Sequence, residues 1–240
     1  MTLRKYFEIG TGNIPIVLSC SHGGYKKPKS ILNKKIGPQI ADKNTYMIAK
    51  WLINSLKEKN HAIYYILSKI HRSKLDLNRP PASESAFNQE SSEARSIHNA
   101  YHDKLIKLTQ ECISIHNKCL LIDLHGFTKP TDDYPDIVLG HVFGKTLQTQ
   151  NNNKTQDCSQ FWGCAQLEQE ISKYFTIDDG MALTDFNLSY SGGYITQKFY
   201  NQKNISAIQI EIAKYIRQDY NLTKNFINII TRSIEELVKK

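Results

Sequence analysis

Two histidines and one glutamate occupy positions in this chain that a hydrophobic core does not require. His22 and His125 each directly follow an apolar segment with the length of a buried strand. Glu211 lies inside the segment AIQIEI, where alternation places it on the same face as Gln209. Ligand sites of open α/β sheets lie at the carboxyl ends of the strands, and imidazole with carboxylate suits zinc. Together, the two histidines and the glutamate favour a metal hydrolase. Taken singly, each histidine is typical of a turn, and the glutamate is typical of an exposed edge strand.

A second group of polar residues lies between the first histidine and the second. The segment HRSKLDLNRP contains Arg72, Asn78 and Arg79 within eight residues. The planar guanidinium group of arginine suits bidentate recognition of a carboxylate. A solvated loop ended by Pro80 and Pro81 is the alternative, and it explains one arginine more readily than it explains the cluster.

The segments around these residues alternate between short apolar runs and amphipathic helices, which is typical of a single α/β domain. Apolar runs predict strands at residues 14–20, 62–67, 119–124, 137–139 and 207–212. Apolar spacings of three and four predict helices at residues 42–59, 93–115, 167–175 and 221–238. The polar, Asn- and Gln-rich stretch 145–159 predicts an exposed loop inserted into the domain, near 145–160.

The composition excludes several classes of protein. The net charge is +8, from 31 Lys and Arg against 23 Asp and Glu, but the lysines are scattered and form no stripe interleaved with aromatic residues. A nucleic-acid binder is therefore not expected. No apolar stretch is long enough for a membrane helix and no secretory signal follows the N-terminus, so we expect a cytoplasmic protein without a membrane partner. The odd number of cysteines and the absence of a CxxC pair indicate buried or incidental thiols.

Six segments, in order, carry a resemblance to a known family. They are VLSCSHGG, HRSKLDLNRP, LLIDLHGF, DIVLG, SGGYI and QIEI, and they span about residues 14–213. Together they resemble the N-formylglutamate amidohydrolase family and, more distantly, the zinc carboxypeptidase and aspartoacylase-like hydrolases. The resemblance implies one three-layer α/β domain over residues 1–240, with a mixed, mostly parallel sheet between helices, of the phosphorylase/hydrolase-like and zinc-carboxypeptidase-like kind.

The resemblance also implies a zinc site. His22 and His125 match the two zinc histidines of the carboxypeptidase pattern. That pattern has a glutamate three residues after its first histidine, where this chain has Tyr25. The amidohydrolase family often has an aspartate further along, near the start of the following helix, and Asp42 fits that place. Asp42 is therefore the expected third ligand.

The remaining roles follow from the same resemblance. Arg72 would stabilise the oxyanion, Asn78 and Arg79 would bind a substrate carboxylate, and Glu211 would be the general base. Tyr194, in the segment SGGY, would close over the substrate if this is a mobile loop, and an ordinary glycine turn is an equal alternative.

The resemblance, together with these residues, implies a zinc-dependent amidohydrolase that cleaves the amide of an N-acylated acidic amino acid, with N-formylglutamate the nearest substrate of the family. The expected partner is a small molecule with a free carboxylate. One alternative is a metallocarboxypeptidase or glutamyl-peptide hydrolase, in which the Asn-Arg pair binds the terminal carboxylate of a peptide. Another is a non-catalytic binding module of the same fold, against which the retention of both histidines and Glu211 argues.

Overall fold

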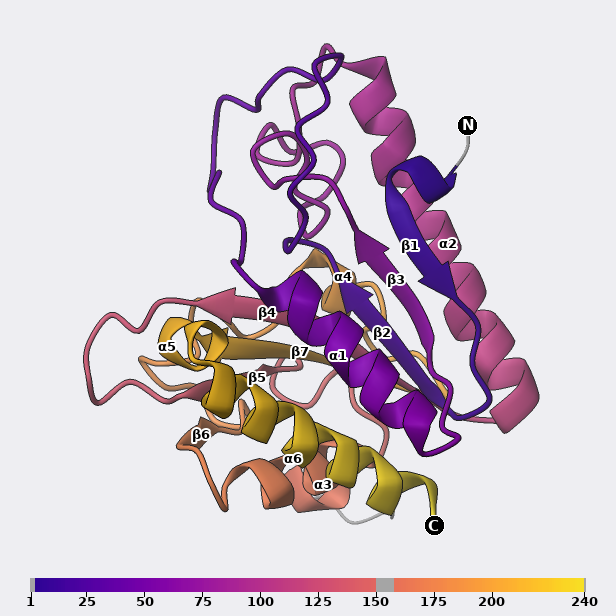
Figure 1. Ribbon diagram of the computed structural model, residues 1–240, viewed down its shortest axis with the longest axis vertical. Helices are drawn as coiled ribbons and strands as arrows, with labels where there is room; N and C mark the ends of the chain where they lie inside the picture. The colour runs from indigo at the N-terminus through magenta and orange to yellow at the C-terminus, as the bar shows by residue number, and fades with distance from the viewer. Residues whose placement is uncertain (1–2, 150–157, 240) are drawn as a thin grey trace.

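A computed structural model describes residues 3–149 and 158–239 (Figure 1). Within these residues, seven strands form one sheet in the order β1-β3-β2-β4-β7-β5-β6. The strands are β1 (Phe7–Gly10), β2 (Ile16–Cys20), β3 (Tyr64–Ser68), β4 (Cys119–Phe127), β5 (Ile137–Gly140), β6 (Ile177–Asp178) and β7 (Ile205–Ala213).

The centre of the sheet is parallel. β2 runs parallel to β3 and β4, and β4 runs parallel to β7 along nine paired residues. β1 pairs antiparallel with β3, and β5 pairs antiparallel with β7. The predicted mixed, mostly parallel sheet is confirmed, and the carboxyl ends of β2, β4 and β7 lie at the same edge.

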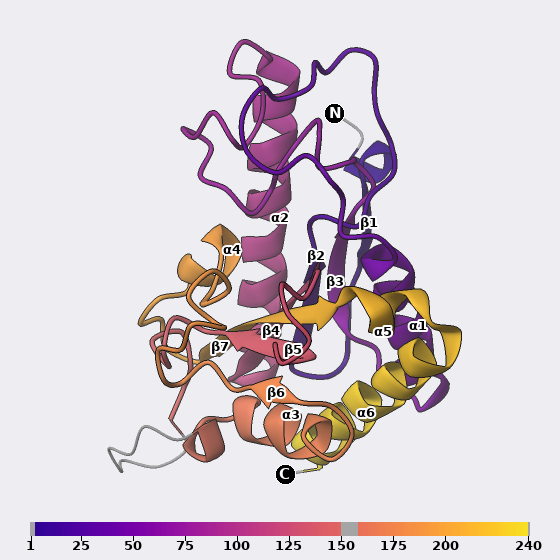
Figure 2. The ribbon, with the colours of Figure 1, turned by 90° about the vertical axis from the view of Figure 1, so that its left-hand side faces the viewer.

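Helices cover both faces of the sheet, so the domain has the three layers that were predicted (Figure 2). The helices are α1 (Thr45–Glu58), α2 (Ser92–His116), α3 (Cys164–Ile171), α4 (Tyr194–Gln197), α5 (Lys214–Gln218) and α6 (Tyr220–Val238), with 3-10 turns at Leu3–Lys5 and Cys158–Gln160. α1, α3 and α6 pack on one face, and α2 with α4 packs on the other.

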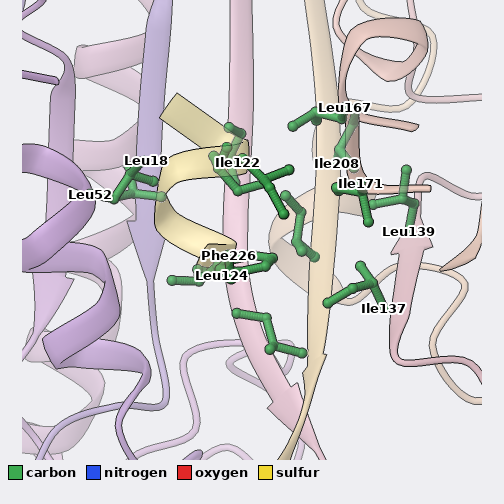
Figure 3. Packing of buried hydrophobic residues seen from close by; sticks show 14 of the residues in the cluster. Leu18, Leu52, Ile122, Leu124, Ile137, Leu139, Leu167, Ile171, Ile208 and Phe226 are labelled. Atoms are coloured by element: carbon green, nitrogen blue, oxygen red, sulfur yellow. The ribbon is translucent and has the colours of Figure 1, made fainter. Parts of the chain in front are cut away.

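Alternation along the central strands divides the core between these two faces. Leu18, Ile122 and Ile208 belong to the cluster that contains α1, α3 and α6 (Figure 3). Their neighbours Val17 and Leu121 belong to the cluster under α2. Burial of one such aliphatic side chain stabilises the fold by about 1.5–3 kcal/mol, so both faces hold the central strands in place.

The structure differs from the sequence prediction at several elements. β4 continues past residue 124 and includes His125, because its pairing with β7 continues to Phe127. β1 and β6 were not predicted, since each is short and only partly apolar. α3 begins at Cys164 rather than 167, after Gly163, whose positive φ of 88° ends the preceding turn.

Two further expectations concern the region after residue 145. Cys158 and Cys164 form a disulfide, so the expectation of buried or incidental thiols was wrong for this pair. Cys158 begins the 3-10 turn before α3 and Cys164 begins α3, a proximity that spacing alone does not reveal. Most of the predicted inserted loop, residues 150–157, lies outside the described residues. No described helix combines the length and the apolar character needed to cross a lipid bilayer.

Candidate active site

His22, Asp42 and His125 come together at the carboxyl edge of the sheet. His22 follows β2, His125 lies in the neighbouring parallel strand β4, and Asp42 precedes α1. Ligating atoms of the three side chains lie within 4.8 Å of one another, and all three residues are buried. The N–H of Asp42 donates to the carbonyl of His22 at 3.1 Å, which fixes the aspartate beside the end of β2.

The turn after β2 is glycine-rich because two backbones approach each other closely there. A Cβ added to Gly23 would lie 2.4 Å from the backbone nitrogen of Tyr46 in α1. Glycine therefore lets β2 end directly against the start of α1. This packing brings His22 and Asp42 together.

A carboxylate binds the Nε2 atom of each histidine, on the side of the ring away from Asp42. His22 Nε2 lies 2.6 Å from Asp76 Oδ1, and His125 Nε2 lies 2.8 Å from Asp123 Oδ2. Because a carboxylate accepts hydrogen bonds, both Nε2 atoms carry a proton, and Nδ1 of each ring is the atom that faces Asp42. This is the arrangement in which proteins orient a metal-binding histidine.

The Nδ1 atoms of the two rings face one oxygen of Asp42. Oδ2 of Asp42 lies 3.4 Å from Nδ1 of His22 and 3.2 Å from Nδ1 of His125. The Nδ1 of His22 is buried and has no hydrogen-bond partner among the described residues. A cation between these three atoms would satisfy it, so the donor set fits a divalent metal that accepts imidazole and carboxylate, such as zinc.

In the metal-free chain, Asp42 and the histidines beside it stabilise each other's charged forms. Burial alone would raise the pKa of Asp42, but His125 and His22 outweigh it and hold that pKa well below its usual value. Burial lowers the pKa of His125, whereas Asp123 and Asp42 raise it well above the usual value for histidine. A bound cation would take the place of the proton on His125.

Glu211 lies on β7, directly opposite His125 in the register of the sheet. Its carboxylate accepts a hydrogen bond from Gln209 Nε2 at 3.0 Å, and the residue is buried in the lining of the cavity. Burial is the largest cause that raises the pKa of Glu211, to about 7. A carboxylate with this pKa can both accept and return a proton near neutral pH.

Arg72 lies in the wall of the same cavity. Its Nε donates to Asp76 Oδ2 at 3.0 Å, and its Nη1 donates to Asp42 Oδ1 at 3.3 Å. These bonds fix the guanidinium group beside the metal-ligand candidates while it remains 14% exposed. A fixed positive group of this kind can stabilise negative charge that develops on a substrate oxygen.

Asn78 and Arg79 also line the cavity, and the structure gives them different surroundings. Asn78 is buried: its Oδ1 accepts from the N–H of Ile195 at 2.9 Å, and its Nδ2 donates to Gln209 Oε1 at 3.2 Å. Arg79 is exposed, and its guanidinium group makes no hydrogen bond or ion pair with any described residue. Arg79 is thus the arginine whose positive charge remains available to a ligand.

Tyr194 lies elsewhere. It begins α4, and its ring packs 5.1 Å from the ring of His102, centroid to centroid, outside the set of residues that line the cavity. Tyr190 lines the cavity instead, from the segment just before Gly192 and Gly193. The structure therefore brings together every other candidate residue named from the sequence.

The cavity itself encloses about 330 Å³, within the size range of small-molecule sites. Its lining combines the candidates from the sequence with residues of two loops. They are His22, Pro38, Asp42, Arg72, Asn78, Arg79, His125, Gly126, Phe127, Ser189, Tyr190, Gly192, Gly193, Gln209 and Glu211.

Several supporting residues were not assigned a role from the sequence. Asp76 and Asp123 each lie two residues from a candidate, Asp123 on the same strand face as His125, and that spacing was the available signal. Arg217 had no such signal. It is buried behind the site, where its Nε donates to the carbonyl of Ile212 and its Nη2 to the carbonyl of Phe127, each at 2.9 Å. It thereby joins the ends of β4 and β7.

Comparisons with known proteins agree with this fold. A family model described as N-formylglutamate amidohydrolase matches residues 14–216. The chain is similar in structure to N-formylglutamate amidohydrolase from Ralstonia eutropha JMP134, with a TM-score of 0.69 at 15% identity, covering 98% of this chain and 97% of that one. It is also similar to a gene product from Agrobacterium tumefaciens, with a TM-score of 0.70 at 14% identity and 99% of each chain covered. No curated protein matches the chain. At these identities, the structural likeness shows the fold.

Proposed function

Since the chain belongs to the N-formylglutamate amidohydrolase family, we propose that it is a zinc-dependent amidohydrolase for N-acylated acidic amino acids, with N-formylglutamate the nearest substrate. One observation carries the proposal. Two histidines, each held by a carboxylate through Nε2, direct Nδ1 toward Asp42. A buried glutamate and Arg79, which has no ion-pair partner among the described residues, line the same cavity.

His22, Asp42 and His125 would hold the ion. Zinc bound by three protein ligands polarises a carbonyl and lowers the pKa of a bound water toward about 7. Asp76 and Asp123 would keep the two imidazole rings in the Nε2–H tautomer, so that the Nδ1 lone pairs remain available.

Glu211 would act as the general base and then as the general acid. Its carboxylate takes a proton from the attacking water and returns it to the leaving nitrogen of the amide. Gln209 holds one carboxylate oxygen, which orients the group within the cavity. Arg72 would stabilise the negative charge that develops on the carbonyl oxygen, an effect commonly worth about 3–4 kcal/mol when one donor is removed.

Arg79 and Asn78 would bind the free carboxylate of the substrate. Arg79 has no competing partner among the described residues, so its guanidinium group can form a charged pair with the ligand. Asn78 gives one Nδ2 proton to Gln209. The same side chain lines the cavity beside Arg79, where it would contact the substrate carboxylate.

The experiment is a panel of N-acyl amino acids assayed for amine release by the purified, zinc-loaded protein. It includes N-formylglutamate, N-formylaspartate, N-formylleucine, a glutamyl peptide and the methyl esters of the acidic substrates. A charged hydrogen bond is worth about 1.5–3 kcal/mol, so we expect each free acid to exceed its ester by roughly 10- to 150-fold in kcat/KM.

Arg79→Ala should remove this preference, whereas Arg232→Ala, an exposed arginine on α6, should leave it unchanged. Equal rates on acid and ester in the unmutated protein would contradict the proposed substrate class. Faster cleavage of the glutamyl peptide than of any N-acyl amino acid would indicate a peptidase instead.

A further inference from the structure

The backbone on either side of Asn78 is held by two histidines that the proposed mechanism does not use. The Nε2–H of His98 donates to the carbonyl of Arg79 at 2.9 Å, and the Nε2–H of His102 donates to the carbonyl of Leu77 at 2.9 Å. Both histidines lie on α2, one helical turn apart on the same face. Their rings lie 4.6 Å apart, centroid to centroid.

These two bonds flank Asn78 and act on Arg79, whose guanidinium group has no hydrogen-bond or ion-pair partner in the described parts of the chain. The guanidinium group of Arg79 is not held by any described residue, so its direction depends on the backbone that carries it. Pro80 follows directly and offers no N–H through which another element could hold the turn. Hydrogen bonds to the carbonyls of Leu77 and Arg79 therefore restrict how this arginine points into the cavity.

The surroundings of both histidines disfavour their charged form. They are 1% and 3% exposed, and burial lowers the pKa of His98 to about 4 and that of His102 to about 2. The nearby cation of Lys198 lowers both pKa values further. A neutral ring that donates from Nε2 has its lone pair on Nδ1, and neither Nδ1 has a hydrogen-bond partner among the described residues. Each ring therefore donates one hydrogen bond, from Nε2 to a backbone carbonyl.

A second metal site does not account for this pair. Their Nε2 atoms are already used by backbone carbonyls. Within the part of the chain that the structure describes, the set of three ligating side chains close enough to share an ion is His22, Asp42 and His125. The remaining role for the two histidines is to hold the backbone of residues 77–79, to which their Nε2 atoms donate.

We propose that His98 and His102 are positioning residues that direct Arg79 toward the substrate carboxylate and so set the preference for acidic N-acyl amino acids. The inference rests on the proposed function, because it assigns a cause to a selectivity that Arg79 supplies. It places part of the substrate specificity on α2, on the opposite face of the sheet from α1, α3 and α6.

The test compares His98→Phe, which removes the donor and keeps a ring, with His98→Gln, whose amide nitrogen lies the same number of bonds from Cα as Nε2. The ratio of kcat/KM on N-formylglutamate to that on its methyl ester is measured for each. Loss of one neutral hydrogen bond predicts a roughly 2- to 13-fold fall in this ratio for His98→Phe. The change should come from a higher KM for the acid, with the ester unaffected.

Three controls separate positioning from a general loss of structure. His98→Gln should restore the ratio to within about 2-fold of the unmutated protein. His116→Phe, at the other end of α2, should leave the ratio unchanged. In the Arg79→Ala background, His98→Phe should produce no further change, because its effect passes through that arginine.

If the acid-to-ester ratio is unchanged in zinc-loaded His98→Phe, whether or not both rates fall, or if the ratio still falls in the Arg79→Ala background, positioning is overturned while the proposed function stands. If the unmutated protein shows no preference for the acid, both proposals fail. If His98→Phe does not fold, His102→Phe with His102→Gln gives the same comparison at the Leu77 carbonyl.

Discussion

Asp123→Asn tests whether the carboxylates behind the histidines tune the metal site. Asp123 is buried between two partners: Oδ1 accepts from Ser19 Oγ at 2.6 Å, and Oδ2 accepts the Nε2–H of His125 at 2.8 Å. Asparagine has the same shape. Its amide oxygen can face His125, and its amide nitrogen can donate to Ser19, whose hydroxyl can then donate to Tyr101 at 2.9 Å. The substitution therefore removes the negative charge and keeps a hydrogen bond to each of the two partners, with the bond to Ser19 reversed in direction.

The lost charge makes the His125 ring a weaker ligand. The carboxylate raises the basicity of the ring and keeps its proton on Nε2, away from the atom that would bind the ion. Replacing such an outer carboxylate typically lowers metal affinity by about 10- to 100-fold, which corresponds to about 1.4–2.7 kcal/mol. At saturating zinc we expect most of the turnover to return, because Glu211 and Arg79 are unchanged.

The assay is competition for zinc against a chromophoric chelator, followed by activity at saturating zinc. Asp103→Asn on the exposed side of α2 makes the same change in net charge away from the site and should retain the original affinity. An unchanged zinc affinity in Asp123→Asn, with normal folding, would refute the role assigned to this carboxylate.

Four further predictions follow from the site. Glu211→Gln should retain zinc while turnover falls by roughly 100-fold or more, and loss of zinc would make Glu211 a ligand instead. Burial raises the pKa of Glu211 to about 7 without a metal, and a bound cation can only lower this pKa. The pH profile of kcat/KM should therefore rise with a midpoint at or below about pH 7. A midpoint above pH 8 would contradict the role of Glu211 as the base. Asp123 and Asp42 outweigh burial and raise the pKa of His125, so zinc must displace a proton. Calorimetry in several buffers should therefore detect about one proton released per ion, with zinc affinity rising as pH rises. Zinc binding without proton release would contradict the protonated state assigned to His125. Gly193→Ala places a Cβ 2.0 Å from Asn78 Nδ2, so activity on acids should fall with zinc retained, and unchanged activity would show that the loop can adjust.

The sequence predicts the positions of the candidate site well because few local features are needed. Parallel strands bring their carboxyl ends to one edge, so polar residues that follow apolar runs meet there. His22 and His125 follow this rule, and the two-residue period of a strand places Glu211 and Gln209 on one face. Asp42 needed the family resemblance, since nothing in its local pattern marks it.

Other features depend on contacts between distant segments and have no local signal. The periodicity of α2 predicts which side of the helix is buried, and His98 and His102 lie on that side. It does not show that their partners are backbone carbonyls some twenty residues earlier, at 2.9 Å. Tyr194 illustrates the opposite case: a glycine-rich segment does lie at the cavity, but Tyr190 lines it and Tyr194 packs against α2.

The central claim is that hydrolysis requires an ion held by His22, Asp42 and His125. The most direct measurement is amine release from N-formylglutamate by protein freed of metal by chelation, and by the same protein titrated with zinc. We predict no turnover without metal and a linear recovery that ends at about one zinc per chain, absent in His22→Ala. Full activity in protein that elemental analysis shows to be metal-free would contradict the account.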